Sequence, residues 1–216
     1  MSIPKVIYQT YSSWKDIPPV ARFHIWNMRR MNPHYRYEFY DDEAINEFLR
    51  REFDPNVFEQ YKKLTIGAAK ADFFRYSILL KKGGVYVDID SRVTGNLNKW
   101  VGSADVAIIS KERNPKMYVQ WALLFDKGHP FLQKTLEKVL DNIENNKFPN
   151  NVHKTTGPSI YSEAIRECIA ENPAIEYREF GIDYNNKINA KFWLSRFSFR
   201  KKEHWKKAQN TQLLIN

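Results

Sequence analysis

Short apolar runs alternate with longer segments of helical periodicity along most of the chain. The short runs predict strands at 6–10, 35–40, 83–90, 106–110 and 119–124. Apolar positions at helical spacing predict helices at 20–31, 42–51, 67–82, 130–145 and 159–169, with Asp42 as the cap of the second and Pro55 opening one more. Strands separated by helices predict an α/β fold with a mainly parallel central sheet flanked by helices, and a ligand site at the carboxyl ends of the strands.

Most of the candidate chemistry lies in the segment Gly83-Gly84-Val85-Tyr86-Val87-Asp88-Ile89-Asp90. Because side chains alternate across a strand, we expect Tyr86, Asp88 and Asp90 on one face and the apolar residues on the other. Two carboxylates so close repel each other and raise one pKa unless a positive charge lies between them. Mg²⁺ and Mn²⁺ are bound by one or two carboxylates together with substrate phosphates, so the pair predicts a metal-bridged phosphate site. A bare Asp-x-Asp is also common as two separate aspartates at a solvated strand end.

The helix predicted at 67–82 precedes this strand, and the double glycine ends it. Asp72 and Arg75 are three residues apart and therefore share one helical face. The pair could form an ordinary surface salt bridge, or the two side chains could together hold a ligand that carries several hydroxyl groups.

The order of helix, double glycine, strand and Asp-x-Asp resembles the sugar-binding DXD region of glycosyltransferase family 32. The opening segment Ile3-Pro4-Lys5-Val6-Ile7-Tyr8-Gln9-Thr10-Tyr11 resembles the first strand of that family, with Tyr8 in place of a histidine and Tyr11 in place of a tryptophan. Further matches are the segment 32–42, then Gly128-His129-Pro130-Phe131, and then Thr156-Gly157-Pro158. The likeness runs in order over about the first 160 residues, and beyond them only Glu203-His204-Trp205 resembles the closing histidine motif.

The resemblance implies a GT-A-type glycosyltransferase that depends on Mn²⁺ or Mg²⁺. It implies transfer of a hexosyl or deoxyhexosyl group from a nucleotide-sugar donor, a UDP-sugar first and a GDP-sugar second, to a carbohydrate or glycolipid acceptor, with retention of the anomeric configuration. A divalent ion would stabilise the charge of the leaving diphosphate.

Candidate site residues follow from the same likeness and fall into three groups. The catalytic candidates are Asp72, Arg75, Asp88, Asp90 and Gln120. The donor-binding candidates are Gln9, Thr10, Tyr11, Asp72, Arg75, Tyr76, Asp88, Gly157 and Lys206. The metal candidates are Asp88, Asp90 and His204.

Three of these residues also have a plainer structural interpretation. Tyr11 could stack on the base of the nucleotide or belong to the core, because an aromatic residue after a strand is usually buried. His204 could complete the metal shell or lie on the polar surface. Gln120 could approach the reacting carbon or serve as an ordinary sheet residue.

Length and composition fit one domain over 1–216, with a nucleotide-sugar part at about 1–110 and an acceptor-side part at about 111–216. A hydrophobic content of 43% argues against disorder, and no apolar run reaches the roughly 18 residues that span a bilayer. No secretory signal is visible, so we expect a cytoplasmic protein, one peripheral at a membrane, or a trimmed Golgi catalytic domain. The single Cys168 permits no internal disulfide and is expected in the core.

A net charge of +9 and a basic, aromatic segment at 191–207 define the rival hypothesis. In that reading the chain is a nucleic-acid-binding or membrane-surface-binding protein without catalysis. In the enzyme reading the same segment suits a diphosphate donor and peripheral membrane contact, with no nucleic acid as partner. A catalytically silent relative with a scaffolding role is a third class. We expect the enzyme.

Overall fold

The computed structural model describes residues 2–192, 195, 199 and 213–215. The strands are β1 Val6–Thr10, β2 Arg36–Tyr40, β3 Gly84–Val87, β4 Arg92–Val93, β5 Ala107–Lys111, β6 Ala122–Phe125, β7 Arg178–Ile182 and β8 Ile188–Asn189. The α-helices are α1 Pro19–Met31, α2 Asp42–Glu52, α3 Pro55–Lys63, α4 Gly67–Lys82, α5 Pro130–Glu144, α6 Val152–Thr155 and α7 Pro158–Glu171. Short 3₁₀ turns lie at Trp14–Asp16, Leu97–Lys99 and Asp183–Asn186.

The central sheet has six strands in the order β2-β1-β3-β6-β5-β7. β1 runs parallel to β2 and β3, and β5 runs parallel to β7. β6 is antiparallel to both of its neighbours, β3 and β5. The expectation of a mainly parallel sheet is therefore confirmed, with β6 as the reversed strand. β4 and β8 form a separate two-stranded antiparallel sheet.

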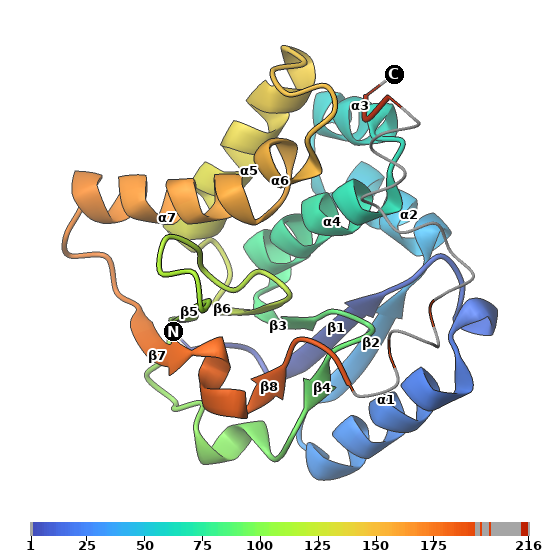
Figure 1. Cartoon of the computed structure of the whole chain (residues 1–216), viewed down its shortest axis with the longest axis vertical. Coiled ribbons are helices and arrows are strands. Elements are labelled where there is room, and N and C mark those ends of the chain that lie inside the picture. Colours follow the sequence, from blue (N-terminus) through green and yellow to red (C-terminus); the bar gives the residue numbers. More distant parts are fainter. Residues whose placement is uncertain (1, 193–194, 196–198, 200–212, 216) are drawn as a thin grey trace.

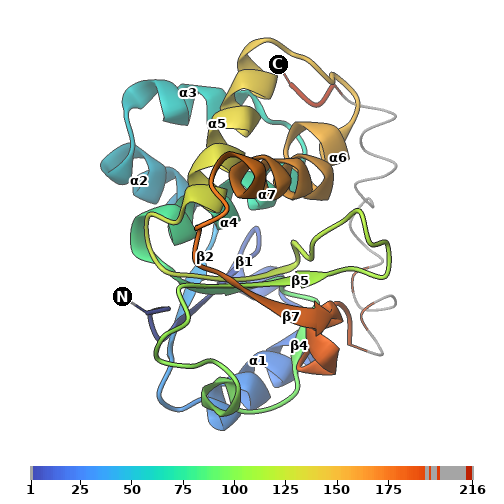
Figure 2. The ribbon, with the colours of Figure 1, turned by 90° about the vertical axis from the view of Figure 1, so that its left-hand side faces the viewer.

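Helices cover both faces of the sheet, but very unequally. Figures 1 and 2 show α2 to α7 together on one face, while α1 and the β4–β8 pair lie on the other. Successive residues of β3 point to opposite faces of the sheet. Tyr86 packs in the core under α4 and α5, whereas Val85 and Val87 pack in the core on the α1 side. The alternation read from the sequence thus holds within the strand itself.

Most element boundaries follow from local stop and start signals. α4 ends at Gly83, whose φ of 63° favours glycine, and a Cβ there would lie 2.7 Å from the backbone nitrogen of Lys127. The cap of α2 is a correction, because the Asp41 carboxylate, not that of Asp42, accepts a hydrogen bond from the backbone of Ala44.

Two further sequence predictions concern single features. The strand predicted at 119–124 begins later, at Ala122, because the preceding residues bridge to the ends of other strands. Cys168 is buried in α7, as expected. None of the described helices is long and apolar enough to cross a membrane.

Candidate active site

The guanidinium group of Arg75 is buried between two carboxylates. Its Nη2 atom lies 3.2 Å from Asp72 Oδ1 and 2.9 Å from Asp88 Oδ1. Its Nη1 atom donates a hydrogen bond of 2.9 Å to the carbonyl oxygen of Gln120, and its charge lies 4.8 Å from the centre of the Tyr86 ring. The side chains of Arg75 and Asp72 are only 6% and 7% exposed, so the surface salt bridge considered from the sequence is excluded.

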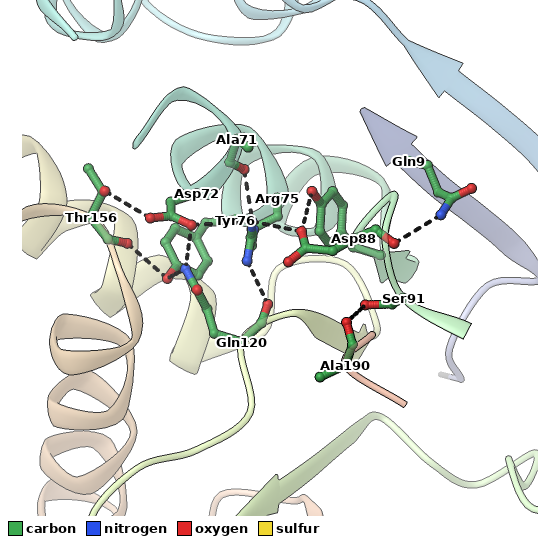
Figure 3. A network of polar contacts seen from close by, with 11 residues as sticks. Gln9, Ala71, Asp72, Arg75, Tyr76, Asp88, Ser91, Gln120, Thr156 and Ala190 are labelled. Atoms are coloured by element: carbon green, nitrogen blue, oxygen red, sulfur yellow. Dashed lines mark hydrogen bonds and ion pairs between the residues drawn. The ribbon is translucent and has the colours of Figure 1, made fainter. Parts of the chain in front are cut away.

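Asp72 is held by two more hydrogen bonds from distant parts of the chain. Gln120 Nε2 donates to Asp72 Oδ1 at 2.9 Å, and the Thr156 hydroxyl donates to Asp72 Oδ2 at 3.0 Å. Gln120 Nε2 also donates to the hydroxyl oxygen of Tyr76, which in turn donates to the carbonyl oxygen of Thr156. Figure 3 shows this network, in which α4 is tied to the segment before β6 and to the junction of α6 and α7.

Burial raises the pKa of Asp72 to about 6, against the opposing effect of Arg75 and of the Gln120 and Thr156 hydrogen bonds. The two opposite charges and the converging donors make this a polar cluster inside an otherwise apolar layer. Clusters of this kind with shifted pKa values are typical of functional sites, although structural ion-pair networks shift pKa values too.

The two aspartates of the Asp-x-Asp motif lie in a turn rather than in the strand. β3 ends at Val87, and the backbone nitrogen of Ser91 donates to the carbonyl oxygen of Asp88 at 3.0 Å. The strand predicted at 83–90 is therefore too long, because β6 begins opposite Val87 and the chain reverses after Asp88. Tyr86 nevertheless stays on the side of Asp88, and its hydroxyl donates to Asp88 Oδ1 at 3.0 Å.

The two carboxylates remain electrostatic neighbours within this turn. Burial raises the pKa of Asp88, and burial together with the negative charge of Asp88 raises the pKa of Asp90. Cations approach from both sides, since Arg75 pairs with Asp88 and Lys191 Nζ lies 4.0 Å from Asp90 Oδ2. The repulsion expected from the sequence is thus present, and protein cations offset part of it.

The donor set of this turn fits a hard divalent ion. Oδ1 of Asp88 accepts hydrogen bonds from Arg75 and Tyr86, which leaves Oδ2 for a cation. The side chain of Asp90 is 28% exposed. Two carboxylates of raised pKa are what a bound cation would stabilise in the charged form. The described residues contain no group of three or more His, Cys, Asp or Glu side chains that could hold a metal. His204, the third ligand expected from the sequence, lies outside the described residues.

Residues of β1 reach the same turn from the other side. Gln9 Nε2 donates to the carbonyl oxygen of Asp88 at 3.1 Å, and Gln9 Oε1 accepts from the Tyr37 hydroxyl at 3.2 Å. Tyr11 is half-buried, with its ring edge-on to Phe199 at 5.8 Å. The pKa of Tyr11 is raised by burial and by nearby negative charge, including that of Asp90. Gln9 and Tyr11 therefore lie beside the Asp-x-Asp turn, and their contact with a nucleotide stays a prediction.

Two other donor candidates have structural contacts instead. The Thr10 hydroxyl donates to the carbonyl oxygen of Tyr40 at 2.8 Å and so joins β1 to the end of β2. Gly157 caps α7, and a Cβ there would lie 2.8 Å from the Cα atom of His153, so its lack of a side chain permits a close backbone approach. Lys206 lies outside the described residues.

Three contacts around the site have no counterpart in the sequence analysis. The Thr156 hydroxyl donates to Asp72 in α4, whereas the sequence places Thr156 only in a loop motif. The Ser91 hydroxyl donates to the carbonyl oxygen of Ala190, and the backbone of Phe192 donates to that of Asp90. These bonds place residues 190–192 against the turn, a long-range contact for which the sequence carries no local signal.

A six-stranded mixed sheet flanked by helices, with a carboxylate pair after β3 beside a buried Asp–Arg pair, has the architecture of the GT-A fold. Two solved structures have this architecture. The PaToxG glycosyltransferase superposes with a TM-score of 0.59 and 21% identity, over 80% of this chain and 71% of that one. The UDP-bound glycosyltransferase domain of the YGT toxin superposes with a TM-score of 0.57 and 9% identity, over 97% of this chain and 88% of that one.

Sequence comparison then gives the family. Residues 18–107 match the family described as the glycosyltransferase sugar-binding region containing the DXD motif. An uncharacterized glycosyltransferase of Acanthamoeba polyphaga mimivirus is 32% identical over 79% of this chain and 68% of that protein. The chain belongs to this family of DXD glycosyltransferases, as the resemblance to family 32 implied.

Fungal relatives are more distant and longer. The initiation-specific alpha-1,6-mannosyltransferase of Schizosaccharomyces pombe is 27% identical over 77% of this chain. The chain spans about half the length of that protein, 49%.

Proposed function

We propose that this glycosyltransferase moves a hexosyl group from a nucleoside-diphosphate sugar to a carbohydrate or glycolipid acceptor, with a divalent metal bound at the Asp88–Asp90 turn. The observation that carries the proposal is this pair of carboxylates of raised pKa at the end of β3, with a buried Asp–Arg pair beside it. When bound, Mn²⁺ or Mg²⁺ would supply Lewis-acid stabilisation of the charge that develops on the leaving diphosphate.

The protein's own groups have separate roles in this proposal. Arg75 fixes the orientation of Asp88 through the 2.9 Å ion pair, so that Asp88 presents its other oxygen to the ligand. Asp90, which has no such partner at that distance among the described residues, is the more accessible ligand for a metal. Asp72 Oδ2 accepts a single hydrogen bond, from Thr156, and keeps capacity for a hydroxyl of the donor sugar.

Gln9 and Tyr11 would border the nucleotide. Gln9 already holds the backbone of Asp88, which couples the position of the Asp-x-Asp turn to the end of β1. Tyr11 presents a half-buried ring beside the turn, and a base could stack on the part that stays exposed. Gln120 is buried and occupied by Asp72 and Tyr76, so we assign it the role of positioning Asp72.

The comparisons support a choice of donors without narrowing it to one. The YGT toxin domain is bound to UDP, which favours a UDP-sugar as first choice, and the Schizosaccharomyces pombe relative is a mannosyltransferase, which favours mannose as the sugar. Retention of the anomeric configuration remains part of the proposal. NMR of the initial product measures that configuration directly.

The decisive experiment is a turnover assay with a panel of UDP-sugars and GDP-mannose, in the presence and absence of Mn²⁺. Hydrolysis to free sugar reports donor use even before the acceptor is identified. We expect Mn²⁺-dependent release of the nucleoside diphosphate from one donor, and a loss of at least about a hundredfold in Asp90→Asn. Asp54→Asn is the matched control, because Asp54 is exposed and its side chain makes no capping hydrogen bond. Equal turnover in Asp90→Asn and wild type would disprove the proposed role.

A further inference from the structure

The outer side of α1 carries two aromatic side chains in solvent. Phe23 and Trp26 are 58% and 55% exposed, and their rings stack on each other at 5.9 Å. Large aromatic side chains are normally covered in a folded domain, and two adjacent exposed ones form a patch that needs a reason. We call the exposed aromatic and basic residues of this helix the α1 outer face; they are Arg22, Phe23, Trp26, Arg29 and Arg30.

These five residues occupy one side of the helix. At about 100° per residue they fall within an arc of about 120° centred on Trp26. The Arg30 guanidinium lies over the Trp26 ring at 5.4 Å. The opposite side of the helix is buried through Ala21, Ile25 and Met28. α1 is therefore amphipathic in an unusual sense, with a buried aliphatic side and an exposed side of aromatic and basic residues.

Charge around this face is of one sign. From Ile17 to Tyr37 the sequence contains four arginines and no aspartate or glutamate. Among the described residues no carboxylate lies within ion-pair distance of Arg22, Arg29 or Arg30. Arg22 donates hydrogen bonds to the carbonyl oxygens of Trp14, Lys15 and Ile17, so Arg29 and Arg30 are the two arginines of this face that can meet an anionic partner.

Helices on the other side of the molecule are different. The exposed sides of α5 and α7 are joined by salt bridges of Lys134 with Glu171 and of Lys138 with Glu163 and Glu167. That arrangement is what a solvated helix face usually shows, with both signs of charge interspersed. The α1 outer face lacks it, so ordinary solvation does not explain its composition.

We propose that the α1 outer face docks on an anionic lipid bilayer. Tryptophan and phenylalanine enter the boundary between headgroups and acyl chains, while arginines on the same helix face contact lipid phosphates. A nucleic acid could satisfy the charge, but the two largest side chains of the face are apolar rings packed on each other. This stacked pair favours an interface with an apolar layer.

The position of α1 gives the docking a consequence for the site. Its buried residues Ala21 and Ile25 pack with Phe192 in a cluster that also contacts Ile89, the middle residue of the Asp-x-Asp turn. The buried side of α1 and the turn that carries the candidate metal ligands therefore belong to one packed cluster. If the proposed function holds, docking brings the transfer site close to membrane-anchored acceptors, but the docking itself depends on no transfer step.

Vesicle co-sedimentation tests the proposal. Wild-type protein is mixed with vesicles of phosphatidylcholine plus phosphatidylserine, or of phosphatidylcholine alone, and bound protein is measured at several salt concentrations. We expect binding to the anionic vesicles that weakens with salt. We expect it to fall at least about tenfold in Phe23→Ser/Trp26→Ser and in Arg29→Gln/Arg30→Gln.

Matched variants remove the same chemistry elsewhere. Ile182→Ser removes an exposed apolar side chain from β7, and Lys62→Gln/Lys63→Gln removes two cations from α3 on the opposite face of the sheet. Both controls should bind like wild type. Thermal unfolding monitors folding, and all four variants should unfold near the wild-type temperature because the substituted side chains lie at the surface.

Four outcomes overturn the inference. The first is that wild-type protein binds neither kind of vesicle. Binding that is unchanged in both α1 variants assigns any membrane contact to another part of the chain. Equal losses in α1 and α3 charge variants indicate diffuse attraction without a docking face. An oligonucleotide that binds through the same residues while anionic vesicles do not would identify a nucleic-acid surface instead. Hydrolysis of the donor is measured separately, so failure of the proposed function is distinguishable from failure of docking.

Discussion

At the scale of single residues, Arg75 is the centre of the site. It forms ion pairs with two carboxylates, one from α4 and one from the turn after β3. The spacing of Asp72 and Arg75 predicted that they could pair. Their burial could not be predicted locally, because it depends on Gln120 and Thr156, which lie 48 and 84 residues from Asp72 in the sequence.

Substitution of Arg75 should be costly for stability. In Arg75→Ala the carboxylates of Asp72 and Asp88 lose their buried counter-charge, and we expect the free energy of unfolding to fall by about 3–5 kcal/mol. Urea unfolding followed by circular dichroism measures the change. Arg113→Ala is the control. The Arg113 side chain pairs with Asp183 but is 93% exposed, so we expect this substitution to change the free energy of unfolding by less than about 1 kcal/mol. A similar small change in Arg75→Ala would contradict the role given to the pair.

At the scale of elements, the bounds of a helix or strand are predicted accurately where residues close to them in the sequence determine them. The bounds of α4 were predicted fully, because the double glycine that ends it acts through its own backbone angles. The strand at 83–90 was predicted too long, because its end is set by β6, which begins at Ala122 and pairs with Val87. The reversed direction of β6 likewise depends on its pairing with β3 and β5, and the sequence pattern of β6 does not indicate that direction.

Gly83 gives a direct test of this junction. Its φ of 63° and the 2.7 Å approach of a Cβ to the Lys127 nitrogen mean that Gly83→Ala should destabilise the protein by about 1–3 kcal/mol or more. Gly67→Ala, at the other end of α4, is the control, since a Cβ there meets nothing within 4 Å. That variant should be neutral or more stable by up to about 1 kcal/mol. Chemical unfolding of both proteins compares them, and the reverse order of stability would refute the strain argument.

At the scale of the whole molecule, the fold concentrates its helices on one face of the sheet and leaves the other to α1 and the β4–β8 pair. The family and the GT-A fold could be inferred from ordered motifs in the sequence. The contact of residues 190–192 with the Asp-x-Asp turn could not, because it joins parts of the chain about a hundred residues apart without a recognisable pattern.

Ligand binding at this turn should stabilise the whole domain. A ligand at a hundred times its dissociation constant adds about 2.7 kcal/mol, which for a chain of this size raises the melting temperature by about 5–10 °C. We expect such a shift with UDP and Mn²⁺ together, measured by differential scanning fluorimetry. UDP with EDTA, and uridine with Mn²⁺, should give much smaller shifts. An undiminished shift in Asp90→Asn would argue against metal binding by that residue.

The hydrogen bonds around Asp72 also determine which parts of the chain must be exchanged together between related enzymes. Gln120 and Thr156 lie beyond residue 110, so the first half of the chain contains Asp72 but not the two side chains that donate hydrogen bonds to it. Recombination between relatives at that boundary would set a foreign glutamine and threonine against Asp72. Chimeras should therefore retain the support of Asp72 better when the exchange falls after Thr156 than when it falls in the middle of the chain.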